Sequence, residues 1–205
     1  MNISRYNQEQ LDAITMVYRF IEAMSSPALA DLKEKISDYM RFRKDAENFF
    51  NRNFNVLCMD KCYQTNVSAC CTHEGIITFF ADVVINVLHS TADQCHAIIQ
   101  ALENDPSGKK CVYLGPAGCL WQVKPIVCEM FLCDAVMNQV FSQGDELKKQ
   151  WDRLKQREKQ FKWPDKPVIF DELEALFIAN GFSSSLMYFH NSPGLLRIKQ
   201  KYLPK

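Results

Sequence analysis

The chain has 205 residues, of which 47% are hydrophobic, so it is long enough to bury a substantial core without depending on crosslinks. Lysine and arginine together number 24, as do aspartate and glutamate, and this balance argues against nucleic acid as a partner. The longest apolar stretches are too short to span a bilayer, and the start has no recognisable secretion signal. We therefore expect a soluble cytoplasmic protein without a membrane partner.

Residues 1–53 are predicted to form an N-terminal helical segment with two helices. In the first helix the apolar residues Leu11, Ile14 and Tyr18 recur at helical spacing. Pro27 suits the first turn of the second helix, which we expect to continue through Ile36 to about residue 50.

Residues 54–142 hold all nine cysteines and are predicted to mix irregular loops with helices. A buried helix is expected over residues 76–89, although the β-branched residues of this stretch are also compatible with a strand, and a second helix is expected over residues 93–103. The sequence Gly-Pro-Ala-Gly at residues 115–118 predicts a turn, and Pro125 suits the start of a helix that runs to about Phe141.

Residues 143–205 are predicted to form a C-terminal helical extension packed on the core. Asp145 suits the start of a helix, Asp171 with Glu174 resembles a capping box, and Gly181 suits a helix end. The predicted fold is therefore mainly α, one globular unit of three segments with a loop-rich cysteine centre.

The cysteines form two clusters, Cys-x3-Cys-x7-Cys-Cys and Cys-x7-Cys-x8-Cys-x4-Cys. Clustered thiols in a cytoplasmic chain serve metal or redox chemistry more often than disulfides. Thiolates are soft donors that suit zinc and iron–sulfur centres. Eight of them permit one mononuclear site with spare thiols, two sites, or a polynuclear cluster. The predicted metal ligands are Cys58, Cys62, Cys70, Cys71, Cys111, Cys119, Cys128 and Cys133.

Other readings remain open at several positions. Cys95 lies on the apolar face of its helix and is expected to be a buried residue, and Cys58 is either core or ligand. His73 is either a surface residue or a substitute for one thiolate. If Cys128 and Cys133 lie in one helix, they point about 140° apart and cannot easily share one small ion.

The cysteine-rich half resembles the zinc- or iron-chelating domain family named for its CxxCxxCC motif. The resemblance covers about residues 58–135, where this chain has CxxxC-x7-CC, ITFFADVV and CVYL followed by GC and KPIVCEMFLC. Here the first motif is longer than in the family, and Lys124 stands where the family usually has arginine. A distant relative, flagellin lysine-N-methylase, has a similar cysteine domain associated with S-adenosylmethionine and an iron–sulfur centre.

Three functions are compatible with the sequence. The leading one is a metal-binding protein whose centre is structural or carries metal. The second is a metal-dependent enzyme such as an S-adenosylmethionine-linked protein methyltransferase, for which Asp82, Lys124 and Glu129 are the best-placed polar residues. A simpler interpretation is that these three residues are solvated charges, or that they hydrogen-bond to the metal ligands and orient them. The third is a protein-interaction module with a structural metal, in which Trp151, Trp163, Phe161 and the C-terminal tail contact a partner.

Overall fold

The computed structural model describes residues 3–58, 77–104, 111–115, 118–142, 144–162 and 168–188. Helices dominate this part of the chain, as predicted, and the two strands are only two residues each. The elements are α1 Arg5–Glu22, α2 Ser26–Lys35, α3 Ser37–Asn53, α4 Asn55–Cys58, α5 Phe80–Leu88, α6 Ala92–Glu103, β1 Leu114–Gly115, β2 Gly118–Cys119, α7 Ile126–Glu129, α8 Asp134–Phe141, α9 Asp145–Lys162 and α10 Ile169–Ala179.

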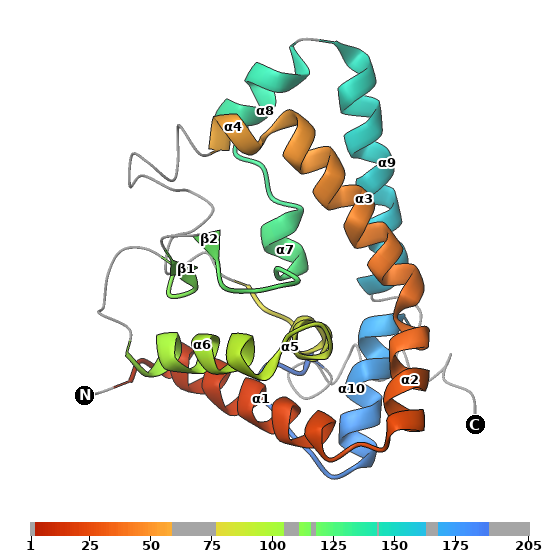
Figure 1. The fold of residues 1–205 in the computed structure, drawn as a ribbon. Coiled ribbons are helices and arrows are strands. Elements are labelled where there is room, and N and C mark those ends of the chain that lie inside the picture. The colour runs from red at the N-terminus through yellow and green to blue at the C-terminus, as the bar shows by residue number, and fades with distance from the viewer. Residues whose placement is uncertain are drawn as a thin grey trace.

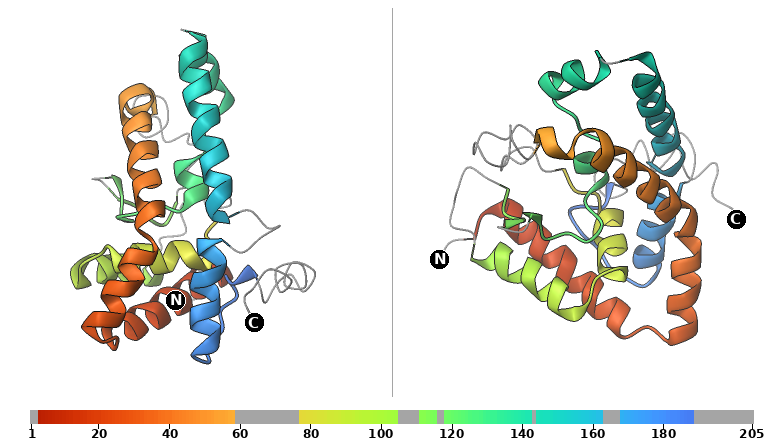
Figure 2. Two further views of the ribbon diagram at one scale, coloured as in Figure 1. Left: turned by 90° about the vertical axis from the view of Figure 1, so that its right-hand side faces the viewer. Right: turned by 45° about the horizontal axis from the view of Figure 1, so that its top comes forward.

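The helices frame the segment that carries the second cysteine cluster (Figure 1). Helix α1 packs on α5 and α6 to form a base, and α5 also packs on α10. Helices α3 and α9 contact each other and rise from this base as an arm (Figures 1 and 2). The hairpin β1–β2 and the short helix α7 lie in the space between base and arm (Figure 1).

Polar caps fix where the first helices begin. The Ser4 side chain accepts a hydrogen bond from the Asn7 N–H at 3.1 Å and starts α1. Ser25 caps α2 in the same way, with Pro27 in the first turn as predicted. Thr91 and Gln94 form a reciprocal capping box at the start of α6.

Helix α5 is the centre of the core. All nine of its residues are buried, which confirms the buried helix predicted for this stretch. Phe80 packs edge-to-face on Phe177 of α10, with ring centroids 5.0 Å apart. Buried residues from all three predicted segments belong to one hydrophobic cluster.

Two predicted helices are interrupted. The helix expected through Ile36 divides there into α2 and α3, so the first 53 residues form three main helices. The helix expected from Pro125 to Phe141 is wrong as one element, because it divides into α7 and α8. The Met130 carbonyl, in the break, accepts a hydrogen bond from Lys155 Nζ of α9 at 2.6 Å.

The start of α10 also differs from expectation. Asp171 is the third residue of the helix, where its carboxylate accepts the Val168 N–H at 2.8 Å. Glu174 is fully buried and accepts the Tyr188 N–H at 3.2 Å, so it holds the segment after the helix. Gly181 follows the helix end with φ of +82°, a left-handed conformation that favours glycine.

Two observations bear on the predicted surfaces. Trp151, which only the interaction-module hypothesis places at a surface, is buried, and Phe161 packs on Tyr39 with ring centroids 5.2 Å apart. Trp163 and the tail beyond Tyr188 lie outside the described residues. None of the described helices combines the length and the apolar character that crossing a bilayer requires.

Candidate metal centre

A short hairpin brings Cys111 and Cys119 into one substructure. The Leu114 N–H donates to the Cys111 carbonyl at 3.0 Å, which closes a turn at the start of the hairpin. Leu114 then pairs with Cys119 across the two antiparallel strands. Residues 116 and 117, where a turn is predicted, lie outside the described residues.

Two polar side chains of α5 hold the segment that joins the hairpin to Cys128. Asn86 Oδ1 accepts the backbone N–H groups of Gln122 at 2.8 Å and Val123 at 3.1 Å. Asp82, one turn earlier on the same helix, accepts the Ile126 N–H at 3.0 Å through Oδ1. These bonds replace the secondary-structure partners that an irregular buried segment lacks, and they fix the start of α7.

A buried arginine fixes the same segment from α3. Arg43 donates to the Lys124 carbonyl at 2.7 Å and to the Tyr39 hydroxyl at 2.9 Å. Its guanidinium lies 3.8 Å from the Glu129 carboxylate, which also lies 3.8 Å from Lys124 Nζ. Arg43 and Glu129 are both buried, so their charges are only weakly screened.

Three cysteines of the second cluster act on the pKa of two tyrosines. Burial above all, with a smaller contribution from negative charge at Cys111 and Cys128, raises the pKa of Tyr6 to about 12 against the lowering effect of hydrogen bonds to Thr78 and Tyr113. The pKa of Tyr113 is also raised, first by burial and then through Tyr6, Cys111 and Cys119. Cys111, Cys119 and Cys128 thus lie within electrostatic reach of one tyrosine pair. Tyr113 also donates to Gln10 Oε1 at 3.1 Å, which links the hairpin to α1.

These cysteines differ from an ordinary core cysteine in burial. Cys95 is 1% exposed, as predicted for a packed residue, and burial raises the pKa of its thiol. Cys111, Cys128 and Cys133 are only half-buried, and Cys119 is exposed. Thiols at the edge of a core remain accessible to a metal, whereas a fully packed thiol is not accessible.

Cys128 and Cys133 lie in different elements. Cys128 is the third residue of α7, whereas Cys133 is the N-cap of α8. The 140° divergence expected inside one continuous helix therefore does not apply to this pair.

A complete metal site is not formed by the described residues alone. Among them, no three His, Cys, Asp or Glu side chains lie close enough to share one ion. Cys62, Cys70, Cys71 and His73 lie outside the described residues, as does the side chain of Cys58. The predicted convergence of the two clusters therefore stays a prediction.

Sequence reasoning missed most of the residues that position the second cluster. Arg43, Asn86, Tyr6 and Gln10 were not singled out as contributors. One signal was present: Asp82 and Asn86 lie four residues apart in an otherwise apolar helix, which is typical of buried side chains that bond to another segment. Nothing in the local sequence around Arg43 distinguishes it from an exposed helical arginine.

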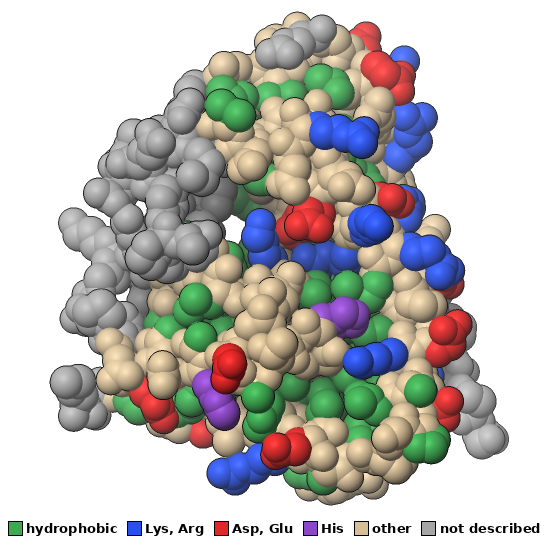
Figure 3. Space-filling model, viewed as in Figure 1, with side chains coloured by type: hydrophobic (Ala, Val, Ile, Leu, Met, Phe, Trp, Pro, Cys, Tyr) green, Lys and Arg blue, Asp and Glu red, His purple; other side chains and the backbone are tan. Residues whose placement is uncertain are grey.

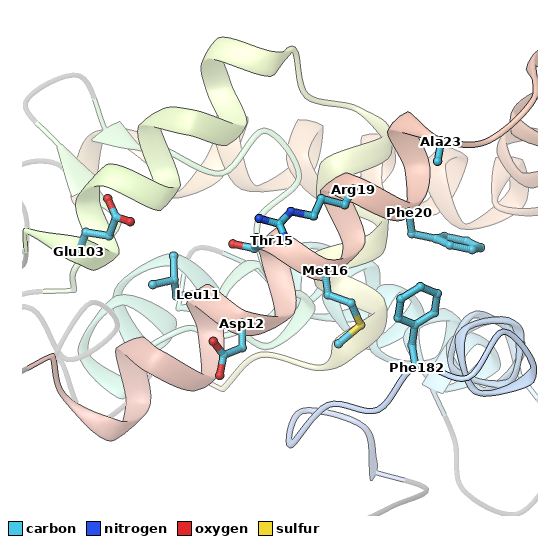
Figure 4. A pocket seen from close by; sticks show the side chains of 9 residues that line it. All are labelled: Leu11, Asp12, Thr15, Met16, Arg19, Phe20, Ala23, Glu103 and Phe182. Carbon is cyan, nitrogen blue, oxygen red and sulfur yellow. The ribbon is translucent and has the colours of Figure 1, made fainter.

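A surface groove of about 640 Å³ lies along α1, and no described cysteine lines it (Figure 4). Leu11, Met16 and Phe20 of α1 line it with Phe182, whose ring centroid lies 5.3 Å from that of Phe20. Its charged rim contains both acidic and basic residues, so it favours no particular ion.

Comparison with known proteins adds no assignment: no family model, no curated protein and no solved structure matches the chain. The resemblance to the CxxCxxCC family therefore remains a prediction from its motifs.

Proposed function

We propose that this protein binds zinc or iron, with an iron–sulfur cluster as one form of the iron, through thiolates of its two cysteine clusters. The centre would crosslink the loop-rich middle of the chain to the helical frame, or carry metal for another protein. A reducing compartment such as the cytoplasm would keep the thiols available.

The observation that carries this proposal is that Cys111 and Cys119 belong to one hairpin, and that Asp82, Asn86 and Arg43 hold the segment that joins this hairpin to Cys128. These cysteines come from a hairpin and a separate helix, and they are half-buried or exposed. Metal ligands usually come from different elements that converge on the ion. Donors from the first cluster would complete the proposed site.

The polar residues around this group support it as positioning residues. Asp82, Asn86 and Arg43 bind the backbone between Cys119 and Cys128, and so they set where these thiols lie. Contacts of this kind orient metal ligands in known sites. Asp82 bonds to backbone N–H groups through both oxygens, which argues against a role in acid–base chemistry.

Elemental analysis of protein purified without oxygen, together with its visible spectrum, tests the proposal. We expect about one or more zinc or iron ions per chain, because tight thiolate sites fill during folding. Fewer than about 0.5 ions per chain would contradict it. A brown preparation with broad absorbance identifies iron–sulfur, and a colourless one that contains metal identifies zinc.

Variants place the metal within the chain. Cys119→Ser and Cys128→Ser should each lower the bound metal severalfold, because each removes a soft donor. The matched control is Cys95→Ala, which removes a thiol from the core and should leave the ratio of metal to folded protein unchanged. Equal metal content in all three variants would exclude the second cluster as a source of ligands.

A further inference from the structure

The seam between α3 and α9 opens into a groove of about 650 Å³. The helices are antiparallel, since Asp45 meets Arg157 near one end of the groove while Arg52 and Leu147 lie toward the other. From residue 45 to residue 52 the groove extends along about two helical turns, or roughly 10 Å. It is large enough for a short peptide segment rather than for a single ion.

Positive charge is in excess in this groove. Arg52, Arg153 and Arg157 line it, and Asp45 is the one acidic residue in its lining. The whole chain is electrically balanced, yet α9 contains seven lysines and arginines against four acidic residues. Basic side chains accordingly gather along the arm formed by α3 and α9 (Figure 3). The groove therefore attracts an anionic ligand from a molecule that has no net charge overall.

The three arginines differ in how far they are already engaged. Arg157 is paired with Asp45 at 2.8 Å and lies over the Phe42 ring. Arg153 pairs with Glu146 at 2.9 Å, but both side chains are largely exposed, so this pair contributes little and can exchange for a ligand. Arg52 is exposed and has no ion-pair partner among the described residues.

The floor of the groove is apolar. Phe49 and Leu154 are buried at its base and Leu147 is half-buried beside them, with the amides of Asn48 and Gln150 at the rim. The half-buried Leu147 leaves some apolar surface beside a guanidinium rim, which matches a ligand that has carboxylates next to an apolar side chain. We propose that this groove binds an acidic peptide segment of a partner protein, with Arg52 and Arg153 as the residues that hold its carboxylates.

Nucleic acid fits the groove less well. Single strands bind where aromatic faces are open for base stacking, and Phe49 and Trp151 are both buried here. Asp45 and Glu146 beside the arginines would also repel a continuous phosphate backbone, whereas a peptide can place its carboxylates selectively. The proposal requires no metal and stands apart from the proposed function.

Fluorescence polarisation with the full chain tests it. The probe is a fluorescein-labelled peptide in which leucines alternate with pairs of glutamates, and its counterpart has lysine in place of glutamate. We expect the acidic peptide to bind at about 50 mM salt and to weaken at about 300 mM, because the contacts are screened. The lysine peptide should not bind, and absence of acidic-peptide binding at low salt would overturn the proposal.

Two double variants with the same change in net charge distinguish binding at the groove from attraction by the overall charge of the protein. Arg52→Glu with Arg153→Glu should weaken the acidic peptide at least about tenfold, since both guanidiniums are replaced by repelling carboxylates. Lys44→Glu with Lys149→Glu alters exposed cations outside the groove on the same helices, and it should change affinity less than about twofold.

Equal weakening in both double variants would overturn the proposal, as would tighter binding of a single-stranded oligonucleotide that is lost in the groove variant. Circular dichroism confirms that each variant is folded. If the glutamate variant is not, Arg52→Ala with Arg153→Ala replaces it, with the same tenfold expectation.

Discussion

Asp82 affects stability in two opposite ways. Its carboxylate accepts the N–H groups of Phe79 and Ile126, each at 3.0 Å, and so fixes the start of α5 and of α7. Burial nevertheless raises the pKa of Asp82 from 3.8 to about 6, although Arg43 and these two N–H groups lower it. The folded state therefore holds the Asp82 proton more tightly than the unfolded chain does.

The pH dependence follows from this raised pKa. The stabilisation from protonated Asp82 is fully present below about pH 4 and decreases as the pH rises to about 6, by about 1.4 kcal/mol for each unit of pKa difference. Asp82→Asn does not titrate, so its loss of unfolding free energy relative to the natural chain should be larger at about pH 4 than at about pH 7. Urea unfolding at several pH values measures this difference, and a constant loss would contradict it.

Arg43 offers a second prediction at the scale of single residues. Arg43→Met removes the hydrogen bonds to Tyr39 and Lys124 and leaves the buried Glu129 carboxylate with only the more exposed Lys124 as its cation. We expect a loss of about 3–5 kcal/mol in the free energy of unfolding, as found when one member of a buried ion pair is removed.

The double variant Arg43→Met with Glu129→Gln should recover part of this loss, because the buried charge is gone as well. The control is Arg41→Met, an exposed arginine two positions earlier in α3, which should cost less than about 1 kcal/mol. If Arg41→Met and Arg43→Met have the same effect in urea unfolding, the buried pair does not stabilise the fold.

At the scale of elements, α5 is both the core helix and the support for the cysteine segment. Asn86→Ala removes the acceptor for the Gln122 and Val123 N–H groups, so two backbone donors lose their partner and the segment before Cys128 is released. We expect a loss of about 2 kcal/mol or more in the free energy of unfolding. If the proposed centre is present, metal affinity should also decrease about tenfold or more.

Asn104→Ala is the matched control, because Asn104 also lies at a helix but is exposed and donates only to the Gln100 carbonyl. It should change neither metal affinity nor, by more than about 0.5 kcal/mol, stability. The prediction fails if a chelator competition assay gives the same metal affinity for Asn86→Ala and the natural chain while both contain metal.

The elements differ in how much of them the sequence could predict. Helix α5 was predictable because a run that is apolar on all sides can only be buried, and α1 and α6 were predictable from periodicity. The division between α7 and α8 was not, because no glycine or proline lies between Glu129 and Cys133. There the Met130 carbonyl bonds to Lys155, a residue of another helix that local sequence cannot identify.

The candidate site, like the helices, could be predicted from the sequence only in part. Cysteine clustering made the candidate ligands visible in the sequence, because metal chemistry restricts the residue type. The contacts of Tyr6 and Arg43 with the cysteine segment depend on tertiary packing of α1 and α3, which periodicity does not specify. The hydrogen bonds that hold the segment between Cys119 and Cys128 could be read only from the structure.

At the scale of the whole molecule, the cysteine segment is tied to four helices. Tyr113 links it to α1 through Gln10, Asn86 and Asp82 link it to α5, Arg43 links it to α3, and Lys155 links it to α9. If metal holds this segment together, removal of the metal should increase hydrogen exchange where the segment contacts the helices. Helix α10 should be unaffected, because it packs on α5 and α9.

Hydrogen exchange with and without a chelator tests this coupling. We expect faster exchange over residues 111–133 and in the first turns of α1 near Tyr6 and Gln10, where the hairpin is attached. Exchange in α10 should stay unchanged, and Cys128→Ser should give the same pattern without chelator. Faster exchange spread evenly over all helices would mean that the metal supports global stability alone. No change anywhere would mean that the segment keeps its structure through the protein contacts by themselves, and either outcome would contradict a local coupling of the metal to α1.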